Sequence, residues 1–151
     1  MKRMVVLLSA LGSIAACQPA ATTTSATAAS EAAFTIGALS DTDAQIQGCT
    51  RSLSRKGGGD TIFAEDGVDT GAKGFIRIDG QLINVGLTAG SGDEQHATRN
   101  FADADHTLAI VESLTTGATH QETDSVEESG TLAVTYKGAT QTIEVEGGVA
   151  C

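Results

Sequence analysis

One eleven-residue stretch decides the fold class of this chain: Phe75-Ile76-Arg77-Ile78-Asp79-Gly80-Gln81-Leu82-Ile83-Asn84-Val85. Apolar residues recur at every second position on both sides of Asp79-Gly80, which is the period of a strand with one buried face. An Asp-Gly pair between two such runs favours a two-residue type I′ turn. Counting outward from that turn pairs Ile78 with Gln81 and Ile76 with Ile83, so we expect an antiparallel hairpin with an apolar core face.

A second hairpin follows the same pattern around Lys137-Gly138. Apolar residues alternate before and after this pair, at Leu132, Val134, Tyr136, Ile143 and Val145. The alternation places Leu132 opposite Ile143. Between the two hairpins, residues 106–112 carry apolar side chains on both faces, with Leu108 and Ile110 on one and Ala109 and Val111 on the other. This pattern predicts a central strand that is buried on both sides.

The remaining elements complete an all-β domain. Shorter strands are predicted at residues 34–39, 47–54, 61–65 and 98–101, and the polar stretch 115–129 is expected to form a long loop or an exposed hairpin. Seven to eight strands without crossover helices predict a small antiparallel β-barrel or a sandwich. An eight-stranded barrel can enclose one small ligand, but we expect this one to be filled by its own side chains.

The N-terminus has the features of an export signal. Met1-Lys2-Arg3 is a short positive region, and residues 4–16 are apolar or small. This segment is shorter than the ~20 apolar residues that span a bilayer, which favours a signal peptide over residues 1–16. It ends in Ile14-Ala15-Ala16-Cys17, which resembles the lipobox of bacterial lipoproteins. The resemblance implies cleavage before Cys17 and lipidation of its thiol, with palmitate among the acyl groups.

Residues 17–33 are expected to tether the lipid to a folded domain at residues 34–151. Ala, Thr and Ser dominate this segment without an apolar period, so it cannot bury enough surface to offset its ordering entropy. In the lipoprotein family, an aspartate after the cysteine retains the protein at the inner membrane, whereas Gln18 follows Cys17 here. The resemblance therefore implies an outer-membrane lipoprotein that faces the periplasm.

Cysteine usage predicts one disulfide. If Cys17 carries lipid, Cys49 and Cys151 remain as an even pair in an oxidising compartment. The alternative is a redox or catalytic thiol at Cys49, but no Cys-x-x-Cys pair is present. We therefore expect a bridge from Cys49 to Cys151 that closes nearly the whole domain.

The charge of the chain limits its partners. The formal net charge is −10 at pH 7. Because phosphate binding needs a basic surface, nucleic acid is an unsuitable partner. Acidity also repels anionic headgroups, so membrane attachment is expected through the lipid anchor rather than through the domain surface.

Candidate catalytic and metal-binding residues are scattered. The three histidines, His96, His106 and His120, stand near carboxylates at spacings that fit no zinc motif, so neither a metal site nor a cofactor is predicted. Gly90-Ser91-Gly92 does not complete a nucleophile elbow. Glu65 and Asp66 flank a turn and are expected at the surface. We therefore expect a protein without enzymatic activity.

The folded part resembles the periplasmic and membrane-bound inhibitors of C-type lysozyme. The residues that carry this resemblance are Ser91-Gly92 and Tyr136-Lys137-Gly138, followed by Thr142-Ile143-Glu144-Val145. The resemblance implies a small β-barrel with a spanning disulfide. It further implies that loops containing Ser91, Tyr136 and Lys137 enter the cleft of a basic lysozyme, which an acidic surface would attract.

Two functions follow from the sequence. The first is a lipid-anchored binding or structural module of the cell envelope that contacts another, unidentified envelope protein. The alternative is an inhibitor of a cell-wall hydrolase, in the manner of the lysozyme inhibitors.

Overall fold

The computed structural model describes residues 33–44, 48–67 and 71–151. The predicted signal peptide, Cys17 and the tether up to residue 32 lie outside these residues. The described part of the chain is all-β and contains nine strands: β1 (Ile36–Gly37), β2 (Thr50–Arg55), β3 (Thr61–Asp66), β4 (Lys73–Ile78), β5 (Gln81–Gly92), β6 (His96–Ala102), β7 (Leu108–His120), β8 (Ser125–Tyr136) and β9 (Ala139–Ala150).

Eight of these strands form a closed antiparallel barrel. The strand order is β1-β4-β3-β2-β9-β8-β7-β6-β5, and the pairing of β4 with β5 closes the ring from β2 to β9. The short strand β1 pairs with the end of β4 as an addition to the ring. Of the two architectures that the sequence left open, the barrel is therefore the observed one.

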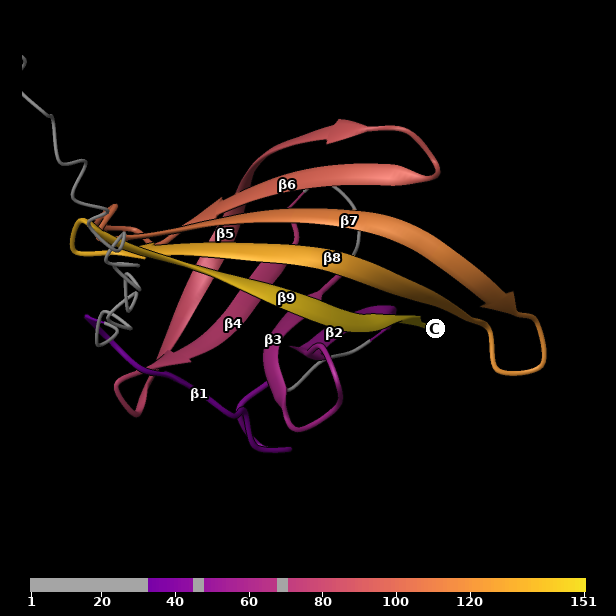
Figure 1. The fold of residues 1–151 in the computed structure, drawn as a ribbon, viewed down its shortest axis with the longest axis horizontal. Coiled ribbons are helices and arrows are strands. Elements are labelled where there is room, and N and C mark those ends of the chain that lie inside the picture. The colour runs from indigo at the N-terminus through magenta and orange to yellow at the C-terminus, as the bar shows by residue number, and fades with distance from the viewer. Residues whose placement is uncertain (1–32, 45–47, 68–70) are drawn as a thin grey trace, which may run out of the picture. The chain divides into compact units, whose positions relative to one another are not determined.

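The barrel has two distinct ends (Figure 1). One end, here called the hairpin end, holds the β5–β6 and β7–β8 turns together with the close of β9. The other, here called the β1 end, holds β1 and the β4–β5, β6–β7 and β8–β9 turns. Because neighbouring strands run antiparallel, successive turns alternate between the two ends.

Both predicted hairpins are confirmed in register. Ile78 lies opposite Gln81 and Ile76 opposite Ile83. Asp79 and Gly80 take the left-handed backbone, with φ of 49° and 81°, which a type I′ turn requires at both central residues. In the second hairpin, Leu132 lies opposite Ile143.

The strand predicted at residues 106–112 differs from expectation. It is the start of β7, and only its Leu108 and Ile110 face is buried, because Val111 on the other face is 40% exposed. A barrel wall has one inner and one outer face, so β7 cannot be covered on both sides. The polar stretch 115–129 does form a largely exposed hairpin, in which only Glu128 is buried; β7 continues to His120 and β8 begins at Ser125.

Apolar side chains fill the barrel from the β1 end upward. The ring of Phe63 meets that of Phe101 edge-on at 5.4 Å between centroids. Phe34 and Ile36 are buried at the β1 end, where Phe34 makes an edge contact with Tyr136. The apolar residues with no exposed area are Leu53, Phe63, Ile76, Leu108, Ile110, Leu132, Val134 and Val145.

A disulfide joins Cys49 to Cys151, as predicted. It links the chain just before β2 to the residue just after β9, at the hairpin end. Because β2 and β9 are adjacent strands of the ring, the bridge fixes their pairing at this end.

Candidate functional site

Five charged side chains form a buried layer inside the barrel, below the hairpin end. This ionic layer consists of Arg51 from β2, Glu65 from β3, Arg99 from β6, Glu112 from β7 and Glu128 from β8. Each has an exposed fraction of 9% or less. Each lies on the core face of its strand, and most lie two residues from a buried apolar side chain on that strand. The strand period therefore places all five side chains inside the barrel.

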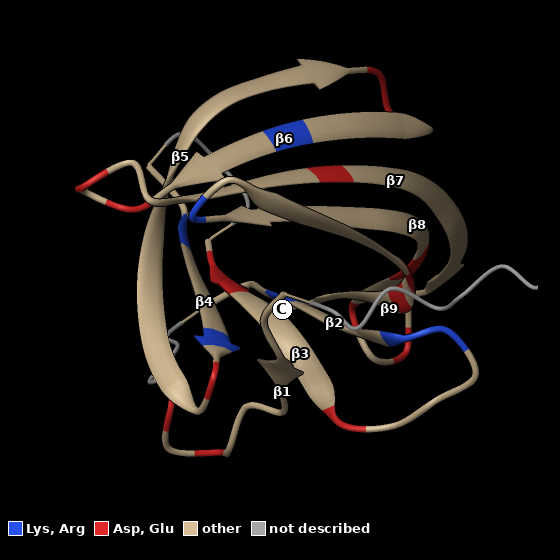
Figure 2. Cartoon of the chain, turned by 60° about the vertical axis from the view of Figure 1, so that its left-hand side comes forward, with Lys and Arg blue, Asp and Glu red and all other residues tan. Residues whose placement is uncertain are grey.

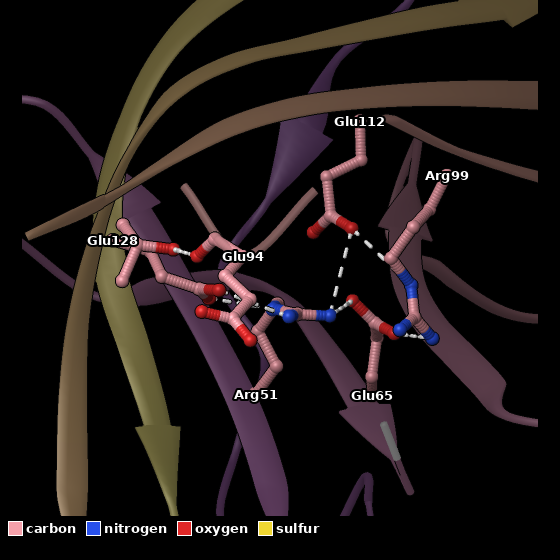
Figure 3. Close-up of polar contacts among 7 residues, drawn as sticks. Arg51, Glu65, Glu94, Arg99, Glu112 and Glu128 are labelled. Carbon is pink, nitrogen blue, oxygen red and sulfur yellow. Dashed lines mark hydrogen bonds and ion pairs between the residues drawn. The ribbon is translucent and has the colours of Figure 1, made fainter. Parts of the chain in front are cut away.

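Arg51 is the centre of the ionic layer (Figure 3). Its Nε and Nη2 donate to the two carboxylate oxygens of Glu128 at 2.6 and 2.9 Å. Its Nη1 donates to Glu65 Oε1 at 3.0 Å and lies 3.8 Å from Glu112 Oε2. A bidentate Arg–carboxylate pair with a further acceptor satisfies the fork of the guanidinium group. Burial lowers the pKa of Arg51, but its three carboxylate neighbours outweigh burial and raise it above its usual range.

Glu65 connects the two arginines. Its Oε2 lies 2.6 Å from Arg99 Nη2, while its Oε1 accepts from Arg51. The Arg99 guanidinium also lies over the ring of Phe101, 5.6 Å from the centroid. The prediction that Glu65 lies at the surface is wrong, because the side chain is on the inner face of β3 with no exposed area. Its neighbour Asp66, on the outer face, is partly exposed.

Glu112 is the least satisfied member of the ionic layer. Its carboxylate lies 3.8 Å from Arg51 Nη1 and 3.7 Å from Arg99 Nε, which is too far for a hydrogen bond to either guanidinium group. Burial and the nearby charge of Glu65 raise its pKa to about 8. Glu112 is therefore mostly protonated at neutral pH, which removes one negative charge from the ionic layer.

The ionic layer carries chemistry that the barrel does not expose. Two neighbouring carboxyl groups, one of them with a raised pKa, are groups that acid–base catalysis can use. However, Glu65 and Glu112 have exposed fractions of 0%. In this structure no substrate could reach them without opening the barrel, so what the ionic layer does here is join strands β2, β3, β6, β7 and β8.

The surface above the ionic layer is acidic. Five exposed carboxylates, here called the acidic rim, lie on the two turns of the hairpin end and beside them: Asp93, Glu94, Glu122, Asp124 and Glu127. Residues 88–98 and 113–128, which build these turns and the adjoining strand ends, contain no Lys or Arg. Figure 2 shows acidic segments at these turns, whereas basic and acidic residues mix at the β1 end.

Hydrogen bonds hold the β5–β6 turn in place above the layer. Asp93 accepts from the backbone N–H groups of Gln95 and His96, and these bonds lower the pKa of its carboxyl group. Thr116 on β7 donates its backbone N–H to Gln95 O and its hydroxyl to Glu94 O, each at 2.9 Å.

The structure does not bring together the residues that the lysozyme-inhibitor resemblance assigned to partner binding. Ser91 is exposed on β5 next to the hairpin end. Tyr136 ends β8 at the β1 end, and the Nζ of Lys137 lies 4.7 Å from the centroid of its ring. The β5–β6 and β8–β9 turns open to opposite ends because two further turns lie between them along the chain.

The three histidines also occupy separate turns. His120 Nε2 lies 2.9 Å from Glu127 Oε1, and His96 Nδ1 lies 3.6 Å from Asp93 Oδ1. His106 lies in the β6–β7 turn at the β1 end, with a φ of 54°. Within the described ranges, no group of three or more His, Cys, Asp or Glu side chains could hold a metal ion.

Comparisons of the chain with family models, with curated proteins and with solved structures give no match. Among residues 33–44, 48–67 and 71–151, no helix is long and apolar enough to cross a membrane.

Proposed function

We propose that this chain is a lipid-anchored binding module of the bacterial cell envelope, without enzymatic activity, whose hairpin end contacts a basic partner protein. In this proposal residues 1–16 are a signal peptide, Cys17 carries the lipid, and residues 17–33 connect it to the barrel. The barrel then stands on the periplasmic side of the outer membrane.

The observation that carries the proposal is that the two ends of the barrel differ: the chain enters at one end, and exposed carboxylates gather at the other. The tether joins the domain at Phe34, which is buried at the β1 end. The acidic rim lies at the opposite end, on turns that lack Lys and Arg. The chain therefore enters the barrel at the end opposite the acidic rim, and the rim carboxylates are exposed to a basic partner. Complementary charge raises the rate of such an encounter.

The filled interior supports a surface-binding role over ligand transport. The inward side chains of the barrel are a packed apolar core and the ionic layer, and their exposed fractions are 9% or less. Small-molecule carriers of this size keep a cavity for their ligand. A protein partner needs only the outer surface and the turns.

Inhibition of a cell-wall hydrolase is the second candidate. The acidic rim favours it, because a basic lysozyme would be attracted to this end of the barrel. Ser91 borders the rim, but Tyr136 and Lys137 do not, so an inhibitor built on this barrel would use a different contact surface from the one that the resemblance implies. A lysozyme activity assay with the purified chain tests this candidate, and no inhibition at micromolar concentration would remove it.

Site-specific photo-cross-linking in living cells tests the main proposal. A cross-linking amino acid at Glu122, on the acidic rim, is expected to capture an envelope protein. The matched control is Asp60, an exposed acidic residue in the β2–β3 turn, from which no specific capture is expected. Equal capture from both positions, or capture from Asp60 alone, would contradict a partner site at the hairpin end.

The anchor has its own test. Replacing Cys17 by Ser is expected to abolish incorporation of labelled palmitate and to release a folded, soluble protein, because no other lipid attachment residue is proposed. Cell fractionation measures the release. A variant that remained bound to the membrane would require both the anchor and the tether to be abandoned.

A further inference from the structure

Among the described residues, no strand pairs with the outer side of the last part of β5. β4 begins at Lys73, opposite Gly86, and the last bond across this seam runs from the Leu87 N–H to the Ala72 carbonyl at 3.0 Å. From there to Gly92, β5 pairs only with β6 among the strands that the structure describes. Figures 1 and 2 both show this part of β5 at the margin of the sheet. Residues 88–92 are here called the free edge.

A bulge sets which backbone groups of the free edge point outward. Before it, Leu87 turns its N–H toward β4. The pairing of β5 with β6 shifts by one residue between Leu87 and Ala89. After it, the Asp93 N–H donates to His96 O, so Asp93 faces β6. Because successive residues of a strand turn their N–H and C=O to opposite sides, Gly90 and Gly92 present theirs outward.

Apart from the bulge at its start, the free edge lacks the devices that usually protect exposed strands. Such edges are normally covered, kept very short, or carry Lys or Pro, because their unpaired groups can pair with another chain. Residues 88–92 are Thr, Ala, Gly, Ser and Gly, and all five are exposed. The side chains are too small to hinder an incoming strand. The outer side of β7 beyond Thr115 is also unpaired with β6, but irregular pairing between Thr116 and Thr119 interrupts it.

We propose that the free edge binds an extended segment of the basic partner as an added β-strand, with Lys or Arg of that segment beside Asp93 and Glu94. This inference rests on the proposed function, since it names the contact that the hairpin end offers. Backbone pairing to Gly90 and Gly92 supplies affinity, and the two carboxylates at the end of the edge select a basic sequence. A second copy of this chain is a poorer occupant, because its net charge of −10 opposes edge-to-edge pairing.

Gly90 provides a sharp test. Gly90→Pro removes the outward N–H and leaves the bonds to β6, which Ala89 and Ser91 make, in place; proline is tolerated where the strand N–H faces solvent. The control is Gly90→Ala, which keeps the N–H, and its Cβ would come no closer than 3.9 Å to Thr98 O. The probe is a ten-residue synthetic peptide of alternating Val and Lys, titrated into the purified full-length chain and both variants.

We expect Gly90→Pro to weaken peptide binding at least tenfold and Gly90→Ala to change it less than twofold. Hydrogen exchange should show the Gly90 and Gly92 amides exchanging fast in the free chain and slowly with peptide bound, and a melting curve checks that both variants fold. Absent peptide binding, or equal binding to both variants, would overturn the added strand while leaving the cross-linking result at Glu122 untouched. If the parent chain formed a dimer and Gly90→Pro abolished that dimer, the occupant of the free edge would be a second copy of the chain. This result would also overturn the proposal.

Discussion

The proton on Glu112 couples the stability of the barrel to pH. The pKa of this carboxyl group rises from 4.5 to about 8 on folding, chiefly through burial and then through Glu65. Between these values the folded chain holds a proton that the unfolded chain has lost, so the free energy of unfolding falls as pH rises from about 4.5 to about 8. Glu112→Gln keeps the shape without the titration. We expect the free energy of unfolding of this variant to match that of the parent at pH 5 and to exceed it by about 3–5 kcal/mol at pH 8.

Urea unfolding at several pH values between 5 and 8 measures this difference. The matched control is Glu128→Gln, which removes the bidentate carboxylate from Arg51 and leaves a buried cation short of its partner. Breaking a buried pair in this way costs about 3–5 kcal/mol. A difference between Glu112→Gln and the parent that stays constant from pH 5 to pH 8 would show that Glu112 is already ionised in the folded chain.

Gly74 is closely packed against core side chains that leave no room for a Cβ atom. A Cβ at this position would lie 2.6 Å from the Phe63 ring and 2.8 Å from a methyl of Val85. Gly74→Ala should therefore lower the free energy of unfolding by about 1–3 kcal/mol through overpacking. Gly86 on the neighbouring strand is the control, because a Cβ there meets nothing within 4 Å. Thermal melting compares the two, and equal effects would contradict the packing explanation.

The ionic layer could have been predicted in part from the sequence. Arg51 is in step with Leu53, Glu65 with Phe63, and Glu112 with Ile110 and Leu114, so a strict period of two places these charges on the core face. Glu65 also flanks a turn, which favoured a surface position, and charged residues are seldom buried unless they are paired. Which charges pair depends on contacts between residues such as Arg51 and Glu128, which are 77 positions apart, and a strand pattern does not contain that information.

At the level of elements, the two tight hairpins differ in the quality of their turns. Both central residues take positive φ in each, at 49° and 81° in Asp79-Gly80 and at 49° and 87° in Lys137-Gly138. Lysine is less suited than asparagine to this conformation. Lys137→Asn should therefore stabilise the barrel by about 0.5–1 kcal/mol, or about 3 °C in melting temperature. Asp79→Asn is the control and should change little, because Asp79 is already a residue that the turn favours.

The same local rules explain which elements the sequence predicted well. Turn residues and alternation are both local, and they placed Ile76 opposite Ile83 and Leu132 opposite Ile143 correctly. They could not place the ends of β7 and β8, because the extension to His120 and from Ser125 is polar and depends on strand pairing rather than on burial. The face of Val111 was misjudged for a related reason, since an apolar residue on an outer barrel wall looks like a core residue in sequence.

For the whole molecule, the disulfide and the ionic layer act on the same end of the barrel. The apolar core and the Phe34 contacts hold the β1 end, whereas the hairpin end contains charged groups whose pairing is balanced against desolvation. Cys49–Cys151 joins β2 to β9 there, across a sequence separation of 102 residues. A bridge over so long a loop stabilises chiefly by restricting the unfolded chain, by an upper value of about 4.7 kcal/mol.

We therefore expect the double variant Cys49→Ser, Cys151→Ser to lose about 2–5 kcal/mol of unfolding free energy. The loss should appear first at the hairpin end, where amide exchange should accelerate in β2 and in the last residues of β9. The β4–β5 hairpin around Asp79 should stay protected, because its pairing and core contacts do not involve the bridge. Thiol titration of the denatured parent, without reductant, should find neither cysteine reactive. Two reactive thiols, or uniform acceleration of exchange through both ends, would contradict a bridge that secures the end carrying the acidic rim.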